Sequence, residues 1–277
     1  MTLQQSSAEI ITHLNQHGAI PIPFNAPYTT FEAAHDAMTA SIAELEEQGI
    51  EHLSLKLDPN KRGSRVGYKF ASRDEGSSDN KIYFHYNPGF DGYFNKFSRN
   101  RHMPKTHSLA KQAKDIYDLS IDTARVYISS LEDAFPGITN EFFPDDVAPQ
   151  GMLRGLQYRS NPNNNSLAEG HNDIGFFTLQ EYESGPGLFM SPRGQDQNIP
   201  VEKHEGFALG FRGFQLHKLL EDMGFEHAES MLPDFHGVED IPKLNHEGTR
   251  KSWVFFLDHP TKYYPNDWHD THTKLFQ

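Results

Sequence analysis

The chain has 277 residues, of which 36% are hydrophobic, and carries a formal net charge of −13 with histidine neutral. This acidic balance disfavours binding to nucleic acid or to an anionic membrane surface, and the absence of cysteine excludes disulfides, thiolate metal sites and cysteine catalysis. Residues 1–5 lack the basic start and apolar run of a signal peptide, and no apolar stretch reaches membrane-spanning length, so we expect a cytoplasmic protein without a membrane partner.

The pattern of turns and apolar runs divides the chain into three parts. We expect one domain over residues 1–277, with a helix-rich part at 1–150, a strand-rich core at 151–260 and a C-terminal tail at 261–277. Short strands separated by Gly and Pro turns, as between Met152 and Leu257, are typical of a jelly roll. The expected fold class is therefore mainly β with helical additions, around a double-stranded β-helix (jelly-roll) core.

Helix signals dominate the first 150 residues. Capping residues, glycine stops and apolar spacing predict helices from Ser6 to His17, from Thr30 to Gly49 and from Ser108 to a point before Pro136, and a later helix at 214–223. Strand-like segments are expected at 20–24, 51–57 and 82–86.

Two polar, glycine-containing segments separate these elements. They span Asp58–Asn80 and Asn87–Lys105, and we expect both to be loops. Loops of this kind commonly close over a reactive site, and Arg101 in the second segment is our candidate for a contact with substrate.

The most informative motif is the H-x-D triplet His171-Asn172-Asp173, which precedes the apolar run 174–179. On an extended strand, side chains two residues apart face the same side. An imidazole and a carboxylate joined by a second histidine form the 2-His-1-carboxylate triad that usually holds non-haem Fe(II) in oxygenases. His236, between apolar neighbours, is the preferred third ligand, while His246 and His227 in the same interval remain alternatives.

A carboxylate-binding pair follows the distal histidine. Arg250 and Ser252 share one face of the strand-like run 250–257. The planar guanidinium offers a fork of donors that often binds a carboxylate in bidentate fashion, and the hydroxyl adds a donor on the same side. Near an open Fe(II) site, this pair suits the distal carboxylate of a 2-oxo diacid.

The ordered set of motifs resembles the Fe(II)/2-oxoglutarate-dependent oxygenases, in the branch similar to isopenicillin N synthase. The resemblance covers about Met152 to Pro260 and includes the segment Leu153–Tyr158, the H-x-D triplet, His236-Gly237-Val238 and the R-x-S at Arg250. It departs from the usual pattern in a longer interval between Asp173 and Arg250 and in Arg159, where many relatives carry proline.

The resemblance implies a set of ligands and co-substrates. Fe(II), 2-oxoglutarate and O2 would take part, and the product would be a hydroxylated, desaturated or cyclised small polar metabolite or amino-acid-like molecule. The metal ligands would be His171, Asp173 and His236, and the 2-oxoglutarate ligands would be Arg250, Ser252 and Tyr158.

Two other functions remain compatible with the same residues. One is an iron oxidase of the same fold that does not use 2-oxoglutarate, in which Arg250 binds a substrate carboxylate. The other is a non-catalytic jelly-roll binding protein. Arg154 and Arg159 flank Tyr158 and are either surface charges or substrate ligands. The sequence does not predict the oligomeric state.

Overall fold

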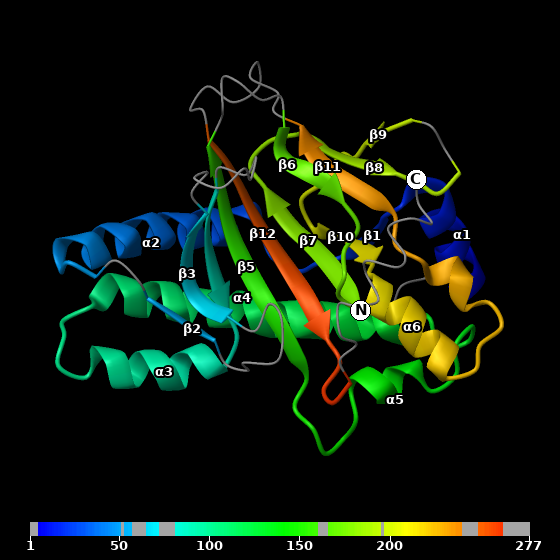
Figure 1. The fold of residues 1–277 in the computed structure, drawn as a ribbon, viewed down its shortest axis with the longest axis horizontal. Coiled ribbons are helices and arrows are strands. Elements are labelled where there is room, and N and C mark those ends of the chain that lie inside the picture. The colour runs from blue at the N-terminus through cyan, green and yellow to red at the C-terminus, as the bar shows by residue number, and fades with distance from the viewer. Residues whose placement is uncertain are drawn as a thin grey trace.

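A computed structural model describes residues 5–50, 53–56, 65–71, 81–159, 166–194, 197–239 and 249–262. Within these residues two antiparallel sheets form a double-stranded β-helix (jelly roll), as expected, and helices cover one face of the larger sheet (Figure 1). No helix among the described residues is long and apolar enough to cross a membrane.

The larger sheet has eight strands and unites both halves of the chain. Its order is β1-β10-β7-β12-β5-β4-β3-β2. The strands are β1 (Ile20–Pro23), β10 (Phe207–Arg212), β7 (Phe177–Glu183), β12 (Thr249–Asp258), β5 (Gln150–Arg159), β4 (Lys81–Tyr86), β3 (Arg65–Ala71) and β2 (Ser54–Lys56). Strands from the N-terminal half thus extend both edges of the core sheet, and β1 is the edge strand that its alternating prolines predict.

The smaller sheet has four strands in the order β6-β11-β8-β9. They are β6 (Ser166–His171), β11 (Phe235–Glu239), β8 (Leu188–Ser191) and β9 (Ile199–Pro200). A small apolar cluster contains residues of both sheets, among them Leu156 and Val254 from the larger and Met190 and Val238 from the smaller. The two sheets therefore face each other across this cluster, with room for a site at its end.

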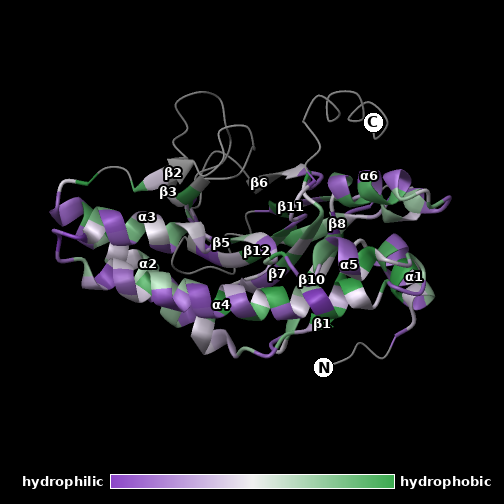
Figure 2. Cartoon of the chain, turned by 90° about the horizontal axis from the view of Figure 1, so that it is seen from below, coloured by the Kyte–Doolittle hydropathy of each residue, from purple (hydrophilic) through white to green (hydrophobic). Residues whose placement is uncertain are grey.

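The helices are α1 (Ser7–His17), α2 (Tyr28–Glu47), α3 (Gly89–Ser98), α4 (Pro104–Ser129), α5 (Ile138–Phe142) and α6 (Phe214–Asp222), with the 3-10 turn η1 (Ala228–Met231). Helix α4 lies on the other face of the larger sheet, and α2 packs against it. Hydrophobic and hydrophilic residues alternate along α2 and α4 (Figure 2), so each helix has an apolar face to bury. α4 crosses beneath the sheet and packs on β5, β12 and β4.

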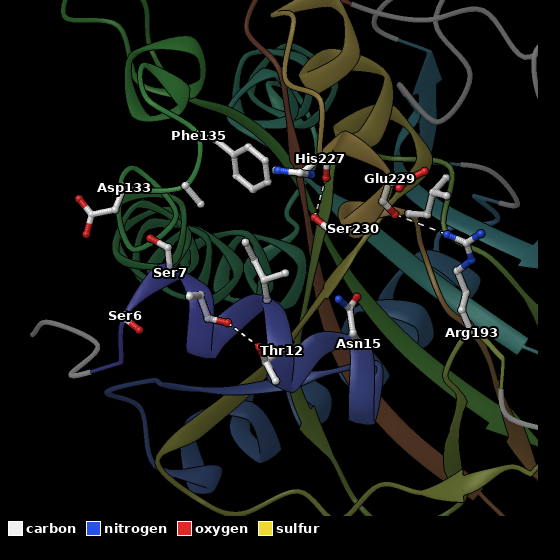
Figure 3. A pocket seen from close by; sticks show the side chains of 14 residues that line it. Ser6, Ser7, Thr12, Asn15, Asp133, Phe135, Arg193, His227, Glu229 and Ser230 are labelled. Carbon is white, nitrogen blue, oxygen red and sulfur yellow. Dashed lines mark hydrogen bonds between the residues drawn. The ribbon is translucent and has the colours of Figure 1, made fainter.

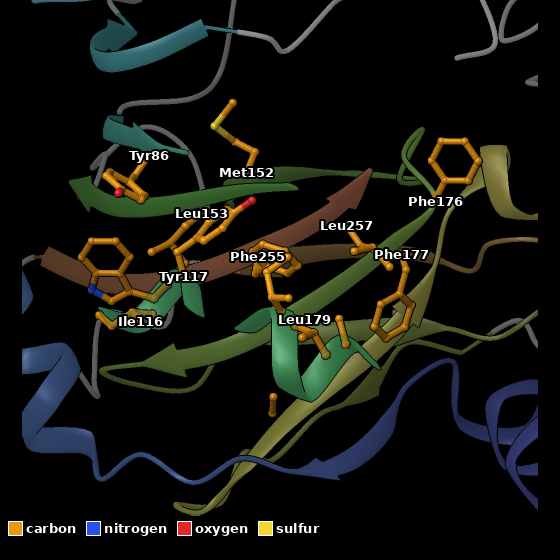
Figure 4. Packing of buried hydrophobic residues seen from close by; sticks show 14 of the residues in the cluster. Tyr86, Ile116, Tyr117, Met152, Leu153, Phe176, Phe177, Leu179, Phe255 and Leu257 are labelled. Carbon is orange, nitrogen blue, oxygen red and sulfur yellow. The ribbon is translucent and has the colours of Figure 1, made fainter. Parts of the chain in front are cut away.

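Alternate residues of strand β12 pack on opposite faces of the larger sheet. Trp253, Phe255 and Leu257 belong to the large core shared with the helices, whereas Val254 lies in the cluster between the sheets. Figure 4 shows Phe255 and Leu257 packed with residues of β7 and α4. Successive side chains of a strand point to opposite faces, so the residues between these core positions are the ones available to a site.

Several helix predictions are confirmed. α1 begins at the predicted cap, because the Ser6 hydroxyl accepts from the Glu9 backbone and the Glu9 carboxylate accepts from the Ser6 backbone. It ends at Gly18, whose φ of 76° is the left-handed conformation that glycine adopts without strain. α2, α4 and α6 also lie where apolar spacing placed them.

Two loop predictions are wrong in part. Asn87–Lys105 contains helix α3, whose Phe90 and Phe94 are buried on one face at the i, i+4 spacing. Asp58–Asn80 contains β3, where Tyr68 pairs with Phe84 of β4 and is buried. In both segments burial of aromatic side chains outweighs the turn-forming tendency of the glycines. The rest of Asp58–Asn80, His246 and the tail after 262 lie outside the described residues.

Candidate metal centre

Three ligand side chains converge at the end of the cluster between the sheets. One ligand atom from each of His171, Asp173 and His236 lies within 4.8 Å of the other two. Asp173 Oδ1 is 3.6 Å from His171 Nε2 and 3.8 Å from His236 Nε2. This is the one such group of metal-ligating side chains among the described residues, and its donor set fits the facial triad expected for Fe(II).

Strand pairing brings the two histidines together across 65 positions of sequence. His171 is the last residue of β6 and is the direct cross-strand partner of His236 on β11, and their ring centroids are 4.6 Å apart. Asp173 lies beyond the end of β6 rather than on it, so the predicted shared strand face is not what aligns the H-x-D pair. Its backbone oxygen instead accepts from Phe214 at the start of α6, 2.9 Å away.

Two hydrogen bonds orient the buried ligands. The Thr178 hydroxyl donates to Asp173 Oδ2 at 2.5 Å, which leaves Oδ1 turned toward the histidines. The His236 Nδ1 lies 3.4 Å from the Asp234 backbone oxygen, so a proton on Nδ1 leaves Nε2, on the side of Asp173 Oδ1, free to bind a metal. Outer hydrogen bonds of this kind tune metal ligands.

The protonation states of the cluster suit metal binding. Burial by itself would raise the pKa of Asp173, but His236, His171 and the Thr178 hydroxyl together hold that pKa well below its usual range. Burial lowers the pKa of His236, partly offset by the Asp173 carboxylate. An ionised carboxylate and a neutral imidazole are the forms that coordinate a metal. His171 is exposed and is the side of the triad nearest to solvent.

The predicted carboxylate anchor lies on the same inner face of the sheet. Arg250 and Tyr158 are cross-strand partners on β12 and β5, with the guanidinium 5.7 Å from the centre of the Tyr158 ring. Arg250 forms a buried ion pair with Glu183 of β7, and its Nε donates to the Gly185 oxygen at 3.3 Å. The Ser252 hydroxyl accepts from Gln180 at 2.8 Å.

The remaining candidates lie apart from the metal cluster. Arg101 is exposed at the end of α3, where it donates to the Phe97 oxygen at 2.7 Å and stacks on the Phe97 ring. His227 is exposed and lines a different hollow. Neither is among the residues around the cluster, and the Arg101 contact with substrate stays an untested prediction.

Sequence reasoning missed three residues around the site. Thr178 lies in the apolar run that follows the triplet, and Glu183 ends the same strand, where it pairs with Arg250. Lys81 is the first residue of β4 and lines the cavity at the cluster. A strand that alternates as Thr178-Leu179-Gln180 carries a signal, because two polar residues at a spacing of two face the same side. Glu183 and Lys81 are placed only by strand pairing, with Lys81 opposite Tyr158.

A cavity of about 90 Å³ lies at the cluster. Its walls include the three metal ligands and side chains of both sheets; those that matter below are Lys81, Arg154, Tyr158 and Phe256. A larger hollow of about 940 Å³ lies elsewhere, between α1, the turn around Phe135 and η1 (Figure 3). We place the site at the smaller cavity, because it alone of the two adjoins the metal-ligating cluster.

Comparison with solved structures identifies the fold. A Neurospora crassa protein in complex with alpha-KG and thymine matches with a TM-score of 0.64 and 16% identity, over 93% of this chain and 81% of that one. Dioxygenase for auxin oxidation 1 from Arabidopsis thaliana, in a 2-oxoglutarate complex, matches with a TM-score of 0.62 and 15% identity, over 95% and 92%.

JOX2, in complex with 2OG, Fe and JA, matches with a TM-score of 0.59 and 19% identity, over 91% of this chain and 70% of that one. At these identities the likeness establishes the fold. No protein-family model and no curated protein sequence matches the chain.

Proposed function

We propose that the protein is an Fe(II)- and 2-oxoglutarate-dependent oxygenase of the branch similar to isopenicillin N synthase. The observation that carries the proposal is the convergence of His171, Asp173 and His236 on one point of a double-stranded β-helix. A triad of two imidazoles and one carboxylate leaves coordination positions open for a co-substrate and O2. Solved proteins of the same fold are complexed with 2OG and Fe.

Each residue of the site has a distinct role in this proposal. His171, Asp173 and His236 hold Fe(II), and Thr178 keeps the Asp173 carboxylate in position. Bound Fe(II) with 2-oxoglutarate and O2 supplies the oxidising power, so that 2-oxoglutarate leaves as succinate and CO2 while a C–H bond of the substrate is oxidised. The apolar walls of the site, among them Phe211 and Val254, exclude water from the reacting atoms.

The 2-oxoglutarate carboxylate remote from the metal is assigned to Arg250, Ser252 and Tyr158. A guanidinium has five N–H donors, of which Arg250 uses one on Glu183 and one on the Gly185 oxygen. Donors therefore remain for a carboxylate placed beside the Tyr158 ring. Glu183 holds the guanidinium in place and also sets a negative charge beside the incoming anion, which makes this anchor weaker than an unpaired arginine.

The substrate is a small molecule, and the cytoplasm is the proposed compartment. Neighbours with this fold are crystallised with small ligands such as thymine and JA. Hydroxylation is the default outcome, and desaturation or ring closure would use the same residues. The net charge of −13 argues against a nucleic-acid substrate.

Metal binding and co-substrate turnover test the proposal. The wild-type protein should bind one Fe(II) or Mn(II) per chain, and with Fe(II) it should form succinate from 2-oxoglutarate. Asp173→Ala and His236→Ala should lose both, while His227→Ala, a histidine away from the cluster, should retain both. O2 uptake that does not depend on 2-oxoglutarate would indicate the oxidase alternative, and wild-type protein that binds no divalent metal would indicate a non-catalytic binding protein.

A further inference from the structure

A second arginine reaches the metal cavity from a different direction. Arg154 of β5 lines the cavity together with the three metal ligands. Its guanidinium lies 4.6 Å from the centre of the Phe256 ring and 5.4 Å from the centre of the Tyr83 ring. Its Nε donates to His85 Nε2 at 2.6 Å. The aromatic rings and the imidazole hold the guanidinium in one orientation, which is the arrangement of a prepared binding group.

Arg154 has no acidic partner among the described residues. Its one hydrogen bond goes to an imidazole nitrogen, and none of its contacts among the described residues is an ion pair with a carboxylate. The Asp173 carboxylate acts on Arg154 electrostatically, but it belongs to the metal-ligating cluster. Burial lowers the pKa of Arg154, yet a guanidinium stays charged in proteins. A charge removed from water is costly unless it is paired, so the site favours an anion at the two terminal amino groups.

Strand register separates Arg154 from the 2-oxoglutarate anchor. Tyr158 is opposite Arg250, whereas Arg154 is opposite Val254 on one side and His85 on the other. Four residues along a strand correspond to about 13 Å. The two side chains therefore leave the sheet at well-separated points, and of the two only Arg154 lines the cavity with the metal-ligating cluster, so we assign the two cations to different anionic groups.

We infer that the substrate of the proposed reaction is an organic carboxylate whose carboxylate group binds Arg154. This inference rests on the proposed function, because it takes the metal cavity as the reaction site. A single negative charge matches the single guanidinium, whereas a phosphate dianion would add a second charge close to Asp173. The fork of two terminal amino groups matches the two oxygens of a carboxylate, and His85 acts as a positioning residue through its bond to Nε.

The test measures preference for charge in otherwise identical molecules. Butanoate, hexanoate and phenylacetate, each compared with its own primary amide, are titrated into the Mn(II) and 2-oxoglutarate complex of the full chain by calorimetry. The variants are Arg154→Gln and Arg154→Lys. The matched control is Arg125→Gln, because Arg125 also stacks on an aromatic ring, that of Phe143, but is exposed on α4. Thermal unfolding and 2-oxoglutarate affinity are recorded for each variant.

We expect at least one carboxylate to bind wild-type protein ten times more tightly than its amide. Arg154→Gln should reduce that preference to less than twofold, Arg154→Lys should retain part of it, and Arg125→Gln should leave it unchanged. The 2-oxoglutarate affinity of all three should stay within threefold of wild type. The inference is overturned if wild type shows no preference, or if Arg154→Gln keeps it. It is also overturned if Arg154→Gln loses 2-oxoglutarate binding, because Arg154 would then hold the co-substrate.

Failure of the proposed function has a different signature. Wild-type protein would then not bind Mn(II) or 2-oxoglutarate, whatever the result with the carboxylates. In that case the same carboxylate and amide pairs are compared on metal-free protein, where loss of preference in Arg154→Gln still supports an anion site at Arg154 and its persistence contradicts one. If Arg154→Gln unfolds at the assay temperature, Arg154→Lys carries the comparison.

Discussion

At the scale of single residues, the presentation of the Asp173 carboxylate depends on Thr178. The hydroxyl donates to the oxygen that faces away from the histidines, so the other oxygen is left for the metal. Loss of such an outer hydrogen bond typically lowers metal affinity or activity about ten- to a hundredfold.

Replacement of Thr178 tests this role without changing a ligand. Thr178→Val keeps the side-chain shape but removes the donor, so Mn(II) affinity measured by calorimetry should fall about ten- to a hundredfold. Thr106→Val is the matched control, because the Thr106 hydroxyl also donates to a buried carboxylate, that of Glu44, away from the metal. Equal metal affinity in wild type and Thr178→Val would show that Asp173 is positioned by the backbone alone.

At the scale of elements, the Arg250–Glu183 ion pair joins strands β12 and β7 inside the sheet sandwich. Both side chains are buried. Removal of one partner of a buried pair leaves an uncompensated charge and costs about 3–5 kcal/mol, whereas replacement of both by apolar groups is often neutral. The pair therefore contributes to orientation of Arg250 more than to net stability.

A double-mutant cycle tests that distinction. In urea unfolding, Arg250→Met should lower the free energy of unfolding by about 3–5 kcal/mol, and addition of Glu183→Leu should restore most of the loss. Arg250→Met should also raise the 2-oxoglutarate concentration required by about tenfold or more. Lys251→Met removes a cation on the opposite face of the same strand, and it should change neither the free energy of unfolding nor the 2-oxoglutarate requirement. Additive losses in the double variant would contradict a coupled pair.

The helix-facing side of β7 carries a second buried acid. Glu181 lies in the larger sheet near α4, and neither of its carboxylate oxygens has a hydrogen-bond partner among the described residues. The nearby Ser120 hydroxyl donates to the Ile116 oxygen instead. Burial raises the pKa of Glu181 to about 8, with the charge of Lys203 acting in the opposite direction. The group is therefore largely a neutral carboxylic acid at neutral pH.

At the scale of the whole molecule, two buried groups limit stability from opposite sides of the pH scale. Glu181 has a folded-state pKa above its ordinary value of 4.5, so its contribution is fully present below pH 4.5 and is lost as pH rises through about 8. His35 packs against Tyr182 and Trp253, and burial with the charge of Lys251 lowers its pKa to about 3. Its contribution is present above pH 6.5 and is lost as pH falls toward 3.

The unfolding free energy should therefore be greatest between about pH 4.5 and 6.5 as far as these two groups decide it. On either side of this range the free energy of unfolding should fall by roughly 1.4 kcal/mol per pH unit. Urea unfolding of metal-free protein at a series of pH values checks the profile. Glu181→Gln should remove the fall above pH 6.5, and His35→Gln should remove the fall below pH 4.5. If a variant keeps the wild-type slope of free energy against pH on its side of the range, other groups cause that fall.

Metal binding should also stabilise the molecule as a whole, because the three ligands lie on two strands and a connecting loop. A ligand that binds only the folded state at a hundred times its Kd adds about 2.7 kcal/mol. Mn(II) should therefore raise the melting temperature of wild type and leave that of Asp173→Asn unchanged. A rise of the same size in Asp173→Asn would show that the metal binds elsewhere.

By itself, the sequence determined the features that depend on neighbours along the chain. The Ser6 and Glu9 capping pair, the Gly18 stop and the apolar spacing of α4 are local signals, and the structure confirms those helices. The order of the H-x-D triplet, the distal histidine and the R-x-S was enough to predict the jelly roll and the three residues that converge.

Tertiary structure alone decided which groups meet across the sheets. Glu183 and Arg250 are 67 residues apart, and Arg154 and His85 are 69 apart, so no local pattern indicates either pair. Alternation along a strand predicts which face a side chain takes, but the register between strands, including the bulge between Trp253 and Val254 in the pairing of β12 with β7, selects its partner. The same reason explains α3, where burial of Phe90 and Phe94 against other elements made a helix from a segment whose composition favoured a loop.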